Sequence, residues 1–321
     1  MEIVHDTKEY RSTSGTSLTI GNFDGLHLGH KKILSQLVST AKVSGTRSMV
    51  VTFSPHPLKV LRPEKAPYLI TTHKEKLDRI GQSGVDTLVI LQFDQELSRL
   101  SGDSFVRKIL VEKLNVKYMF VGENFVFGHR RSGDVALLRA LSQDLGYSVH
   151  IVPEVVVRGS RVSSTRIREL IKLGKIALAN RLLGRYYEVS GDVVTGRGLG
   201  QKFLFPTLNM KLHNEIIPHS GVYVTTTKID GRQHPSVTNV GWRPTVGGRD
   251  LTVESHILGT VLAETPRHIG LAFLHRLRDE QKFDSLTRLK ERIGKDCLRA
   301  SRFFRLMERL QRTGQPTPLT L

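Results

Sequence analysis

Short apolar runs alternate with segments of helical period through the first half of the chain. The apolar runs are Leu18–Ile20, Met49–Phe53, Thr87–Leu91, Tyr118–Val121 and Val149–Val152. Between the first two runs, Ile33, Leu37 and Ala41 lie on one face of a predicted helix. Strands separated by helices pair in parallel through crossover connections, so we expect a parallel sheet with helices on both faces. Ligands of such sheets bind beyond the carboxyl ends of the strands.

The pattern changes near Tyr187, where turns replace helices between the apolar runs. These later runs are Glu188–Val194, Val222–Ile229, Val237–Val240, Thr252–Leu258 and His268–Leu274. Strands joined by turns rich in Gly, Pro and Asp favour an antiparallel β-barrel. A helical segment over residues 284–310 would pack on this barrel. We therefore expect two domains, residues 1–184 and 185–310, followed by a flexible tail at 311–321.

Length and composition are those of a two-domain soluble protein. The chain has 321 residues, of which 39% are hydrophobic and 24% are charged. It contains no apolar run of membrane-spanning length, and its polar start does not resemble a signal peptide, so we expect no membrane association. The single cysteine, Cys297, excludes an internal disulfide, and we expect a cytoplasmic protein.

The formal net charge of +18 is the one unusual global property. Such a charge suits either nucleic acid or polyanionic small ligands such as ATP. The sequence has no long block of consecutive basic residues and no familiar nucleic-acid-binding signature. We therefore favour phosphate-rich small ligands over nucleic acid. No feature of the sequence indicates an oligomeric state.

The stretch TIGNFDGLHLGHKKIL, residues 19–34, joins an apolar strand to an amphipathic helix. Glycines such as Gly21 and Gly29 allow the backbone to approach a ligand. A helix starting near His30 would direct free N–H groups at the same point, and the imidazoles of His27 and His30 would donate to phosphate oxygens. Two alternatives are a metal-binding pair, for which no third ligand is evident nearby, and two purely structural histidines.

A second phosphate-binding segment is VSSTRIREL, residues 162–170. Ser163, Ser164 and Thr165 stand at the predicted start of a helix, where hydroxyl groups commonly cap free N–H groups. Arginines such as Arg168 follow directly, which favours a phosphate clamp over simple capping.

These motifs resemble a known enzyme family. The string GNFDGLHLGH resembles the signature of the nucleotidylyltransferase superfamily, whose His-x-Gly-His element binds a nucleoside triphosphate. Together with TFSPHP (52–57), GENFVFG (122–128) and VSSTRIREL, it resembles the FMN adenylyltransferase domain of bacterial bifunctional riboflavin kinase/FAD synthetase. The resemblance covers nearly all of residues 15–184 and implies a Rossmann-like domain with a parallel sheet.

The resemblance also implies roles for individual residues of this domain. His27 and His30 would hold the ATP phosphates and stabilise the transition state at the α-phosphorus. The other residues expected at the nucleotide and its phosphates are Gly21, Phe23, Asp24, Gly29, Ser163, Ser164, Thr165 and Arg168. Asn124 and Phe125 would contact the flavin. No general base is required, because the attacking FMN phosphate is already a nucleophile.

The second domain opens with a glycine-rich loop, GRGLGQKFLFPTLNM, at residues 196–210. Thr207 and Asn209 are two residues apart, so in a strand their oxygen-bearing side chains share a face and suit a magnesium ion. Glu254 and His256 likewise share one strand face.

These segments resemble the riboflavin kinase module of the same bacterial family, over residues 184–305. The resemblance implies that Thr207 and Asn209 bind Mg2+, that Glu254 is the general base for the ribityl hydroxyl, and that the loop around Gly200 wraps ATP. The chain departs from the family pattern at three places: Gln201, Leu204 and the segment GTVLAETPRH (259–268).

The sequence therefore predicts a bifunctional enzyme that phosphorylates riboflavin to FMN and adenylylates FMN to FAD, releasing pyrophosphate. ATP is the co-substrate of both steps, Mg2+ is the expected metal, and riboflavin, FMN and FAD are substrates or products. The first alternative is an FMN adenylyltransferase with an impaired kinase domain. Others are an adenylyltransferase for pantetheine phosphate or nicotinamide mononucleotide, and a basic nucleic-acid-binding protein on an idle nucleotidyltransferase scaffold.

Overall fold

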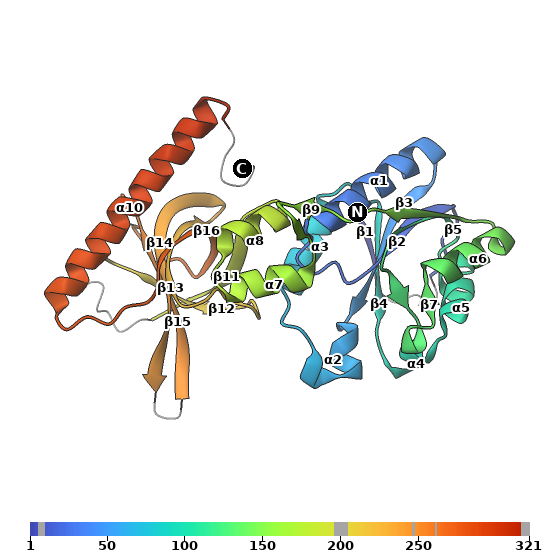
Figure 1. Cartoon of the computed structure of the whole chain (residues 1–321), viewed down its shortest axis with the longest axis horizontal. Coiled ribbons are helices and arrows are strands. Elements are labelled where there is room, and N and C mark those ends of the chain that lie inside the picture. The colour runs from blue at the N-terminus through green and yellow to red at the C-terminus, as the bar shows by residue number, and fades with distance from the viewer. Residues whose placement is uncertain (6–9, 196–204, 246–247, 261, 316–321) are drawn as a thin grey trace. The chain divides into compact units, whose positions relative to one another are not determined.

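The computed structural model divides into two compact units (Figure 1). The first unit comprises Met1–Tyr68 and His73–Val162, and the second comprises Leu69–Thr72 and Ser163–Leu321. The structure describes residues 1–5, 10–195, 205–245, 248–260 and 262–315. The domains expected from the sequence, residues 1–184 and 185–310, were defined as catalytic modules. A catalytic module need not coincide with a compact unit, so these limits stay predictions.

The first unit is built on a six-stranded parallel sheet in the order β1-β4-β3-β2-β5-β8. Its strands are β1 Glu2–His5, β2 Thr16–Ile20, β3 Arg47–Ser54, β4 Thr87–Gln92, β5 Val116–Gly122 and β8 Ser148–Val152. The predicted parallel sheet is confirmed, and β1 is a strand that the sequence analysis missed. It pairs with β4 at the edge of the sheet.

Helices and short strands connect the sheet strands. The helices are α1 Leu28–Ser44, α2 Pro57–Leu61, α3 His73–Gly81, α4 Gln95–Arg99, α5 Gly102–Phe105 and α6 Val135–Leu145. A π-helix, Val106–Val111, continues α5, and two 3-10 turns lie at Pro63–Lys65 and His129–Arg131. The short strands are β6 Val126–Phe127, β7 Gly133–Asp134, β9 Val156–Val157 and β10 Ser160–Arg161.

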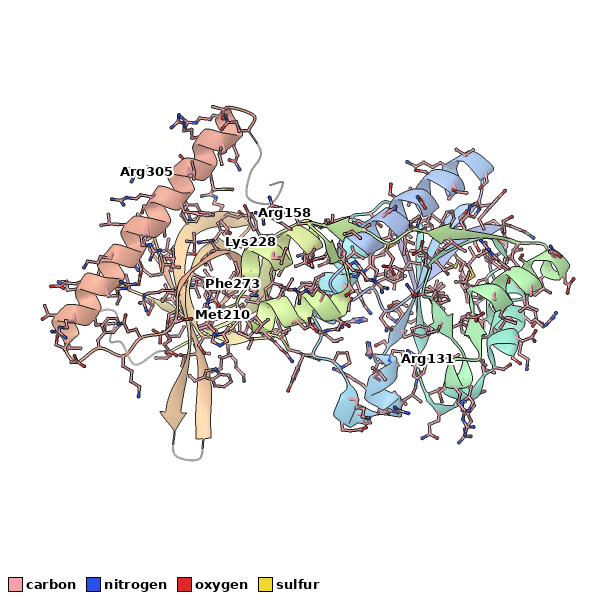
Figure 2. All side chains as sticks on the ribbon, viewed as in Figure 1. Arg131, Arg158, Met210, Lys228, Phe273 and Arg305 are labelled. Atoms are coloured by element: carbon pink, nitrogen blue, oxygen red, sulfur yellow. The ribbon has the colours of Figure 1, made fainter. Side chains whose placement is uncertain are left out.

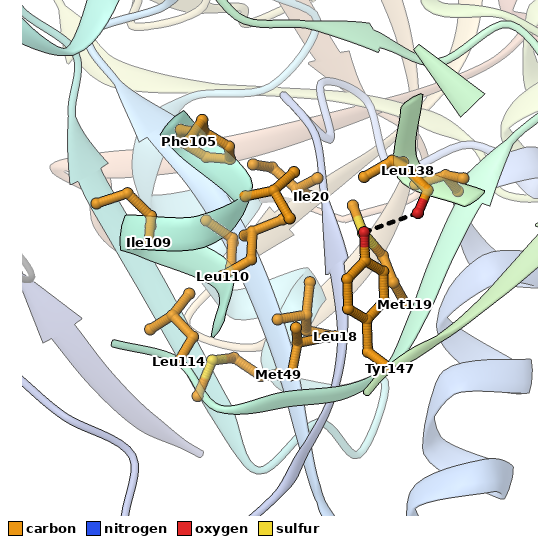
Figure 3. Close-up of a cluster of buried hydrophobic side chains, with 14 of the residues drawn as sticks. Leu18, Ile20, Met49, Phe105, Ile109, Leu110, Leu114, Met119, Leu138 and Tyr147 are labelled. Carbon is orange, nitrogen blue, oxygen red and sulfur yellow. Dashed lines mark hydrogen bonds between the residues drawn. The ribbon is translucent and has the colours of Figure 1, made fainter. Parts of the chain in front are cut away.

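Successive residues of the central strands enter two different cores. On β3, Met49 and Val51 belong to the core under α5 and α6, whereas Val50 belongs to the core under α1 and α3. Figure 3 shows the first of these cores, in which Tyr147 donates a hydrogen bond to the carbonyl oxygen of Leu138 (2.8 Å). Both faces of the sheet are therefore buried, which explains why its strands read as unbroken apolar runs.

The second unit contains a closed antiparallel barrel in the order β11-β12-β15-β14-β13-β16, as the sequence predicts. Its strands are β11 Tyr187–Val194, β12 Leu208–Leu212, β13 Gly221–Ile229, β14 Arg232–Thr245, β15 Gly248–Ile257 and β16 His268–Arg278. Five of these strands coincide with the apolar runs of the sequence, and the sixth, β12, is the short strand that the glycine-rich loop was expected to enter.

Hydroxyl groups fill part of the barrel interior. The side chains of Thr225, Thr227, Ser236, Thr238 and Ser255 are fully buried and hydrogen-bond to one another over 2.7–3.1 Å. Phe273 and Tyr223 pack edge to face in the same interior, and Figure 2 shows Phe273 within the barrel. The buried hydroxyls of this cluster are therefore hydrogen-bonded to one another.

The terminal helix α10, Leu286–Arg312, packs on the outside of the barrel. Its first turn is capped by Ser285, whose Oγ accepts a hydrogen bond from the backbone N–H of Arg288 (3.3 Å). The cluster beneath it contains Val222, Val224 and Ala300. The predicted terminal helix is thus confirmed; of the predicted tail, residues 316–321 lie outside the described residues.

A buried ion pair joins α10 to β16. Nε of Arg278 donates to Oδ2 of Asp296 over 2.8 Å, and the two side chains are only 13% and 2% exposed. Arg292 lies farther from the same carboxylate, at 3.7 Å. The pair fixes the helix against the barrel through two oppositely charged groups that are largely removed from water.

Helices α7 Ser164–Lys172 and α8 Ile176–Leu183 also belong to the second unit. The buried amide of Asn180 donates to the carbonyl oxygen of Phe273 (2.8 Å) and accepts from the N–H of Tyr187 (2.7 Å). One side chain therefore ties α8 to both β16 and β11.

Replacing Asp296 by Ala should lower the free energy of unfolding by about 3–5 kcal/mol, because it leaves the Arg278 guanidinium buried without its partner. Chemical denaturation of the full chain measures this loss. The double variant Arg278→Met/Asp296→Leu, which removes both charges, should recover most of it. Equal losses in the single and double variants would show that the charge pair is not the source of the effect.

Candidate active sites

The turn between β2 and α1 is buried and tightly wound. Phe23, Gly25 and Leu26 have positive φ angles of 48°, 78° and 39°, a region that glycine alone enters without strain. Asp24 and His27 are only 4% and 7% exposed. The turn therefore has one defined shape at the carboxyl end of a central strand, where ligands of parallel sheets bind.

The imidazole of His27 caps α1, which begins at Leu28 rather than near His30. The backbone N–H of His30 donates to Nδ1 of His27 over 3.3 Å. Since Nδ1 is the acceptor, the neutral ring carries its proton on Nε2, and that atom is a donor. The start of α1 adds N–H groups without intrahelical acceptors and a partial positive charge.

The rings of His27 and His30 stack on each other, with centroids 3.7 Å apart. Phe23 covers His30 at a centroid distance of 5.0 Å. Burial, and to a lesser degree the neighbouring His27, holds the pKa of His30 well below the ordinary imidazole value. In the described part of the chain, Nδ1 of His30 is buried without a hydrogen-bond partner. His30 is therefore neutral at pH 7.

Gly21 and Gly29 make room for aromatic rings. A Cβ atom at position 21 would lie 3.3 Å from the Phe23 ring, and one at position 29 would lie 3.2 Å from Cε1 and Nδ1 of His27. A side chain at either position would therefore press on a ring of this site. The contact of both glycines with a nucleotide stays a prediction.

Lys76 of α3 joins this site and was not anticipated from the sequence. Its ammonium group donates to Oγ1 of Thr52 (3.3 Å), and the Thr52 hydroxyl donates to the carbonyl oxygen of Asn22 (3.4 Å). Burial lowers the pKa of Lys76, while the nearby charge of Asp24 raises it. The helix sequence HKEKLDRIG is an ordinary amphipathic one, so no local signal marks this lysine.

The TFSPHP segment contacts the turn through His56 as well as through Thr52. Nε2 of His56 lies 3.2 Å from Nδ2 of Asn22.

The two predicted flavin residues follow β5 in the first unit. Nδ2 of Asn124 donates to Oε1 of Glu154 (2.5 Å), and the same oxygen pairs with Arg161 (2.5 Å). Phe125 is half-buried and stacks on Phe127 with centroids 5.3 Å apart. A flavin contact at Asn124 would have to share an amide that already binds a carboxylate, and both flavin roles stay predictions.

The predicted phosphate clamp lies at the start of α7. Oγ of Ser163 accepts a hydrogen bond from the backbone N–H of Arg166 (3.2 Å), so this hydroxyl caps the helix. Ser164 and Thr165 occupy the first turn, and Arg168 follows on the next turn. Their phosphate contacts stay predictions.

Some predicted features lie outside the described residues. They are Gly200, Gln201 and Leu204 in the glycine-rich loop. The effect of the departures at Gln201 and Leu204 on ATP binding therefore stays untested, and the role of Gly200 stays a prediction.

A cavity of about 320 Å³ lies between the barrel and α10. One part of its wall is apolar and includes Val222, Phe283 and Leu289, whereas another part carries Thr207 and Glu254. Cavities of this volume, with apolar walls and a few polar groups, are typical of small-ligand sites.

The residues predicted for kinase chemistry occupy one row across three strands. Asn209 of β12 is directly opposite Glu254 of β15, which is in turn opposite Asn239 of β14. Residues opposite each other in an antiparallel ladder point to the same face. The structure therefore brings Asn209 and Glu254 together and adds Asn239. Thr207 lines the same cavity as Glu254.

Further residues line this cavity that the sequence analysis did not assign to the site. Nδ1 of His256 lies 2.9 Å from the carbonyl oxygen of Pro206, which fixes the entry into β12. Arg278, Asp296 and Cys297 line the wall near α10. Burial, together with the charge of Asp296, raises the pKa of the Cys297 thiol to about 11, so the thiol stays protonated.

Comparison with known protein families gives two matches in tandem. Residues 9–166 match the family model described as FAD synthetase, and residues 183–304 match the model described as riboflavin kinase. Together the two matched segments cover most of the chain.

Similar proteins extend over nearly the full length. The chain is 37% identical over 293 residues to the bifunctional riboflavin kinase/FMN adenylyltransferase of Escherichia coli K12, covering 91% of this chain and 94% of that protein. It is 38% identical over 287 residues to the protein of the same name from Pseudomonas fluorescens, covering 89% and 92%.

A solved structure shares the architecture. A crystal structure named as a macrolide-efflux protein from Streptococcus pneumoniae superimposes with a TM-score of 0.83 at 26% identity, covering 92% of this chain and 97% of that one. In this chain, none of the helices among the described residues has the length and apolar character needed to cross a bilayer.

The buried, neutral state of His30 makes folding stability depend on pH. Its pKa is lowered on folding, so the unfolded chain takes up a proton first, and stability falls as the pH drops below about 6.5. The variant His30→Asn removes this group, so its melting temperature should fall less than that of the wild type between about pH 7 and pH 5. His73 and His275, whose pKa values burial also lowers, titrate in both proteins and cancel in the comparison. Identical pH profiles would contradict a buried neutral His30.

Proposed function

The chain belongs to the family of bifunctional riboflavin kinases/FMN adenylyltransferases, and we propose that it makes FMN from riboflavin and then FAD from FMN, with ATP as co-substrate of both steps. The observation that carries this function is the tandem match of both catalytic modules within one chain. The two candidate sites, one at the start of α1 and one between the barrel and α10, support two separate reactions.

In the adenylylation step, an FMN phosphate oxygen attacks the α-phosphorus of ATP and pyrophosphate leaves. The attacking phosphate is already ionised, so the protein contributes positioning and stabilisation of charge. We assign His27 Nε2–H, the neutral ring of His30 and the N–H groups of α1 to the phosphates. Neutral donors with a fixed orientation act on charge that develops during the reaction, without binding the ground state as tightly as a permanent cation would.

The remaining residues of this step have supporting roles. Gly21, Phe23 and Gly29 shape the turn, and Asp24 lies beside Lys76 near the nucleotide. Ser163, Ser164, Thr165 and Arg168 bind the triphosphate and the leaving pyrophosphate. Asn124 and Phe125 contact the flavin.

In the kinase step, the ribityl hydroxyl of riboflavin attacks the γ-phosphorus of ATP, the bond from that phosphorus to the bridging oxygen breaks and ADP leaves, and Glu254 accepts the hydroxyl proton. The row formed by Asn209, Glu254 and Asn239 supports this role, because it sets a carboxylate between two amides at a cavity wall. Thr207 and Asn209 offer the oxygen ligands that Mg2+ prefers, and the ion, when bound, would neutralise charge on the ATP phosphates. The loop around Gly200 is assigned to ATP.

We assign the flavin ring system to the 320 Å³ cavity. Its apolar wall on α10 suits a flat aromatic ring, and its polar wall at Thr207 and Glu254 suits the hydroxylated chain that is phosphorylated. Residues 1–184 then form the adenylyltransferase domain and residues 185–310 the kinase domain. A cytoplasmic location agrees with the single, protonated thiol.

The variant His27→Ala should stop FAD formation while leaving FMN formation intact. Removing one preorganised donor at a charged transition state costs about 10²–10³ in rate. Incubation with riboflavin, ATP and Mg2+, followed by chromatography, should show FMN accumulating. The control is His129→Ala, which removes an exposed histidine of the same unit whose ring Nδ1 donates to the carbonyl oxygen of Ser98 (3.0 Å). Normal FAD formation by His27→Ala would refute the assigned role, and wild type that forms neither product would refute the proposed function.

The variant Glu254→Gln should behave in the opposite way. Loss of a general base costs about 10²–10⁴ in rate, so riboflavin should not be turned over, whereas supplied FMN should still be converted to FAD. Glu188→Gln, an exposed carboxylate on β11 of the same barrel, serves as the matched control. Riboflavin turnover at the wild-type rate would remove Glu254 from the mechanism; wild type that converts FMN but not riboflavin would point to an impaired kinase domain.

A further inference from the structure

Three side chains converge on the outer surface of the barrel, outside both candidate active sites. Asp192 of β11 is directly opposite His268 of β16. His213 directly follows β12, and its backbone N–H donates to the carbonyl oxygen of Ser190 (2.8 Å). Ser190 and Asp192 are two residues apart on one strand and share a face, so all three side chains stand on the same side of the sheet.

The ligating atoms of these side chains lie close together. Nε2 of His213 is 2.9 Å from Oδ2 of Asp192, and Nδ1 of His268 is 3.2 Å from Oδ1 of the same carboxylate. One ligand atom from each residue can be chosen so that all three lie within 4.8 Å of one another. Among the described residues, this is the one trio of His, Cys, Asp or Glu side chains with such a geometry.

We propose that Asp192, His213 and His268 form a binding site for a transition-metal dication of the Zn2+ type. Two imidazole nitrogens and one carboxylate oxygen are the ligands that Zn2+ and its neighbours in the first transition series prefer. Three protein ligands leave a fourth tetrahedral position for water. The side chains are 44–58% exposed, so an ion reaches them from solvent.

The spacing of the ligand atoms suits such an ion after side-chain rotation. Metal–ligand bonds of about 2.0–2.2 Å place neighbouring ligand atoms of a tetrahedral site about 3.4 Å apart. The two histidines lie 2.9 and 3.2 Å from different oxygens of Asp192, and one atom from each of the three residues lies within 4.8 Å of the others. Their backbones belong to three paired strands or directly follow one, so little ordering of the chain is required for binding.

This site is separate from the proposed Mg2+ site. Asn209 and His213 are four residues apart on or next to β12, which corresponds to roughly 13 Å along a strand. One ion cannot bridge that distance. Mg2+ also prefers oxygen ligands and retains its water, so it competes poorly for a site with two imidazoles.

Lys211 provides a test of the local electrostatics. It stands opposite Asp192 in the β11–β12 ladder and therefore shares its face, but it is not a ligand. Its positive charge opposes a bound cation, so replacing it should preserve or strengthen metal binding.

The experiment titrates Zn2+ into untagged, full-length protein in the presence of saturating Mg2+, by calorimetry. The variants His213→Gln and His268→Gln should each lose one Zn2+ equivalent or bind it at least about tenfold more weakly. Removing a residue that only supports a metal ligand already lowers metal affinity by about tenfold or more, so removing a ligand should cost at least as much. Lys211→Gln, the matched control on the same face, should retain that equivalent. All three positions are exposed, and circular dichroism checks that the variants fold.

Two results would overturn the proposal. One is wild type that binds no Zn2+ under these conditions. The other is a pair of histidine variants that bind Zn2+ with the stoichiometry and affinity of the wild type, which would assign the ion to other groups. Substituting Co2+ gives a second readout, because a tetrahedral site should produce visible absorption that the histidine variants lack.

Discussion

The two-residue period of the β-strand decides where each candidate site can lie. In the first unit, alternate residues of the central strands enter two separate cores, so neither face of the sheet is open to a ligand. The polar side chains buried within the strands are small hydroxyls such as Thr19 and Ser48, and the histidines assigned to the site lie beyond the end of β2. The buried turn after β2, with His27 at its end, is the place where the chain leaves the sheet and a helix begins.

The same constraint gives the opposite result in the barrel. Inward-facing residues such as Thr225 and Ser255 form a buried hydroxyl cluster whose members hydrogen-bond to one another. The residues that we propose for the kinase reaction face outward from β12, β15 and β14, and α10 covers part of this outer face. Glu254 and Asn239 line the cavity between the barrel and α10, and Asn209 lies beside Glu254 in the same row.

Local pattern was enough to predict the fold and the residues that strong motifs carry. The parallel sheet, the barrel and the terminal helix follow from apolar runs and turn residues, and Glu254 follows from its family motif. Lys76 and Asn239 were missed for a different reason: each reaches its site through pairing or packing between segments far apart in sequence. Periodicity describes one element at a time. It therefore does not predict the register between strands or which residues of α10 line the cavity.

Positive surface charges and neutral imidazoles have different roles in this molecule. The excess positive charge lies on many separate elements, as Arg131, Arg158, Lys228 and Arg305 illustrate in Figure 2. The site that we propose for phosphates at α1, by contrast, offers imidazoles, of which His30 is kept neutral by burial, which lowers its pKa. A dispersed surface charge attracts polyanions without selecting among them, whereas oriented neutral donors distinguish one geometry from another.

The ion pair between Arg278 and Asp296 connects stability with the barrel cavity. Both side chains line the cavity, and Oδ1 of Asp296 is buried without a hydrogen-bond partner in the described part of the chain. A buried acceptor of this kind is costly in the empty cavity and is relieved by any ligand that donates to it. Arg292 Nε lies 3.7 Å from that oxygen and compensates its charge without a hydrogen bond. The contact that holds α10 on the barrel therefore also forms part of the wall of the cavity that we propose for the flavin.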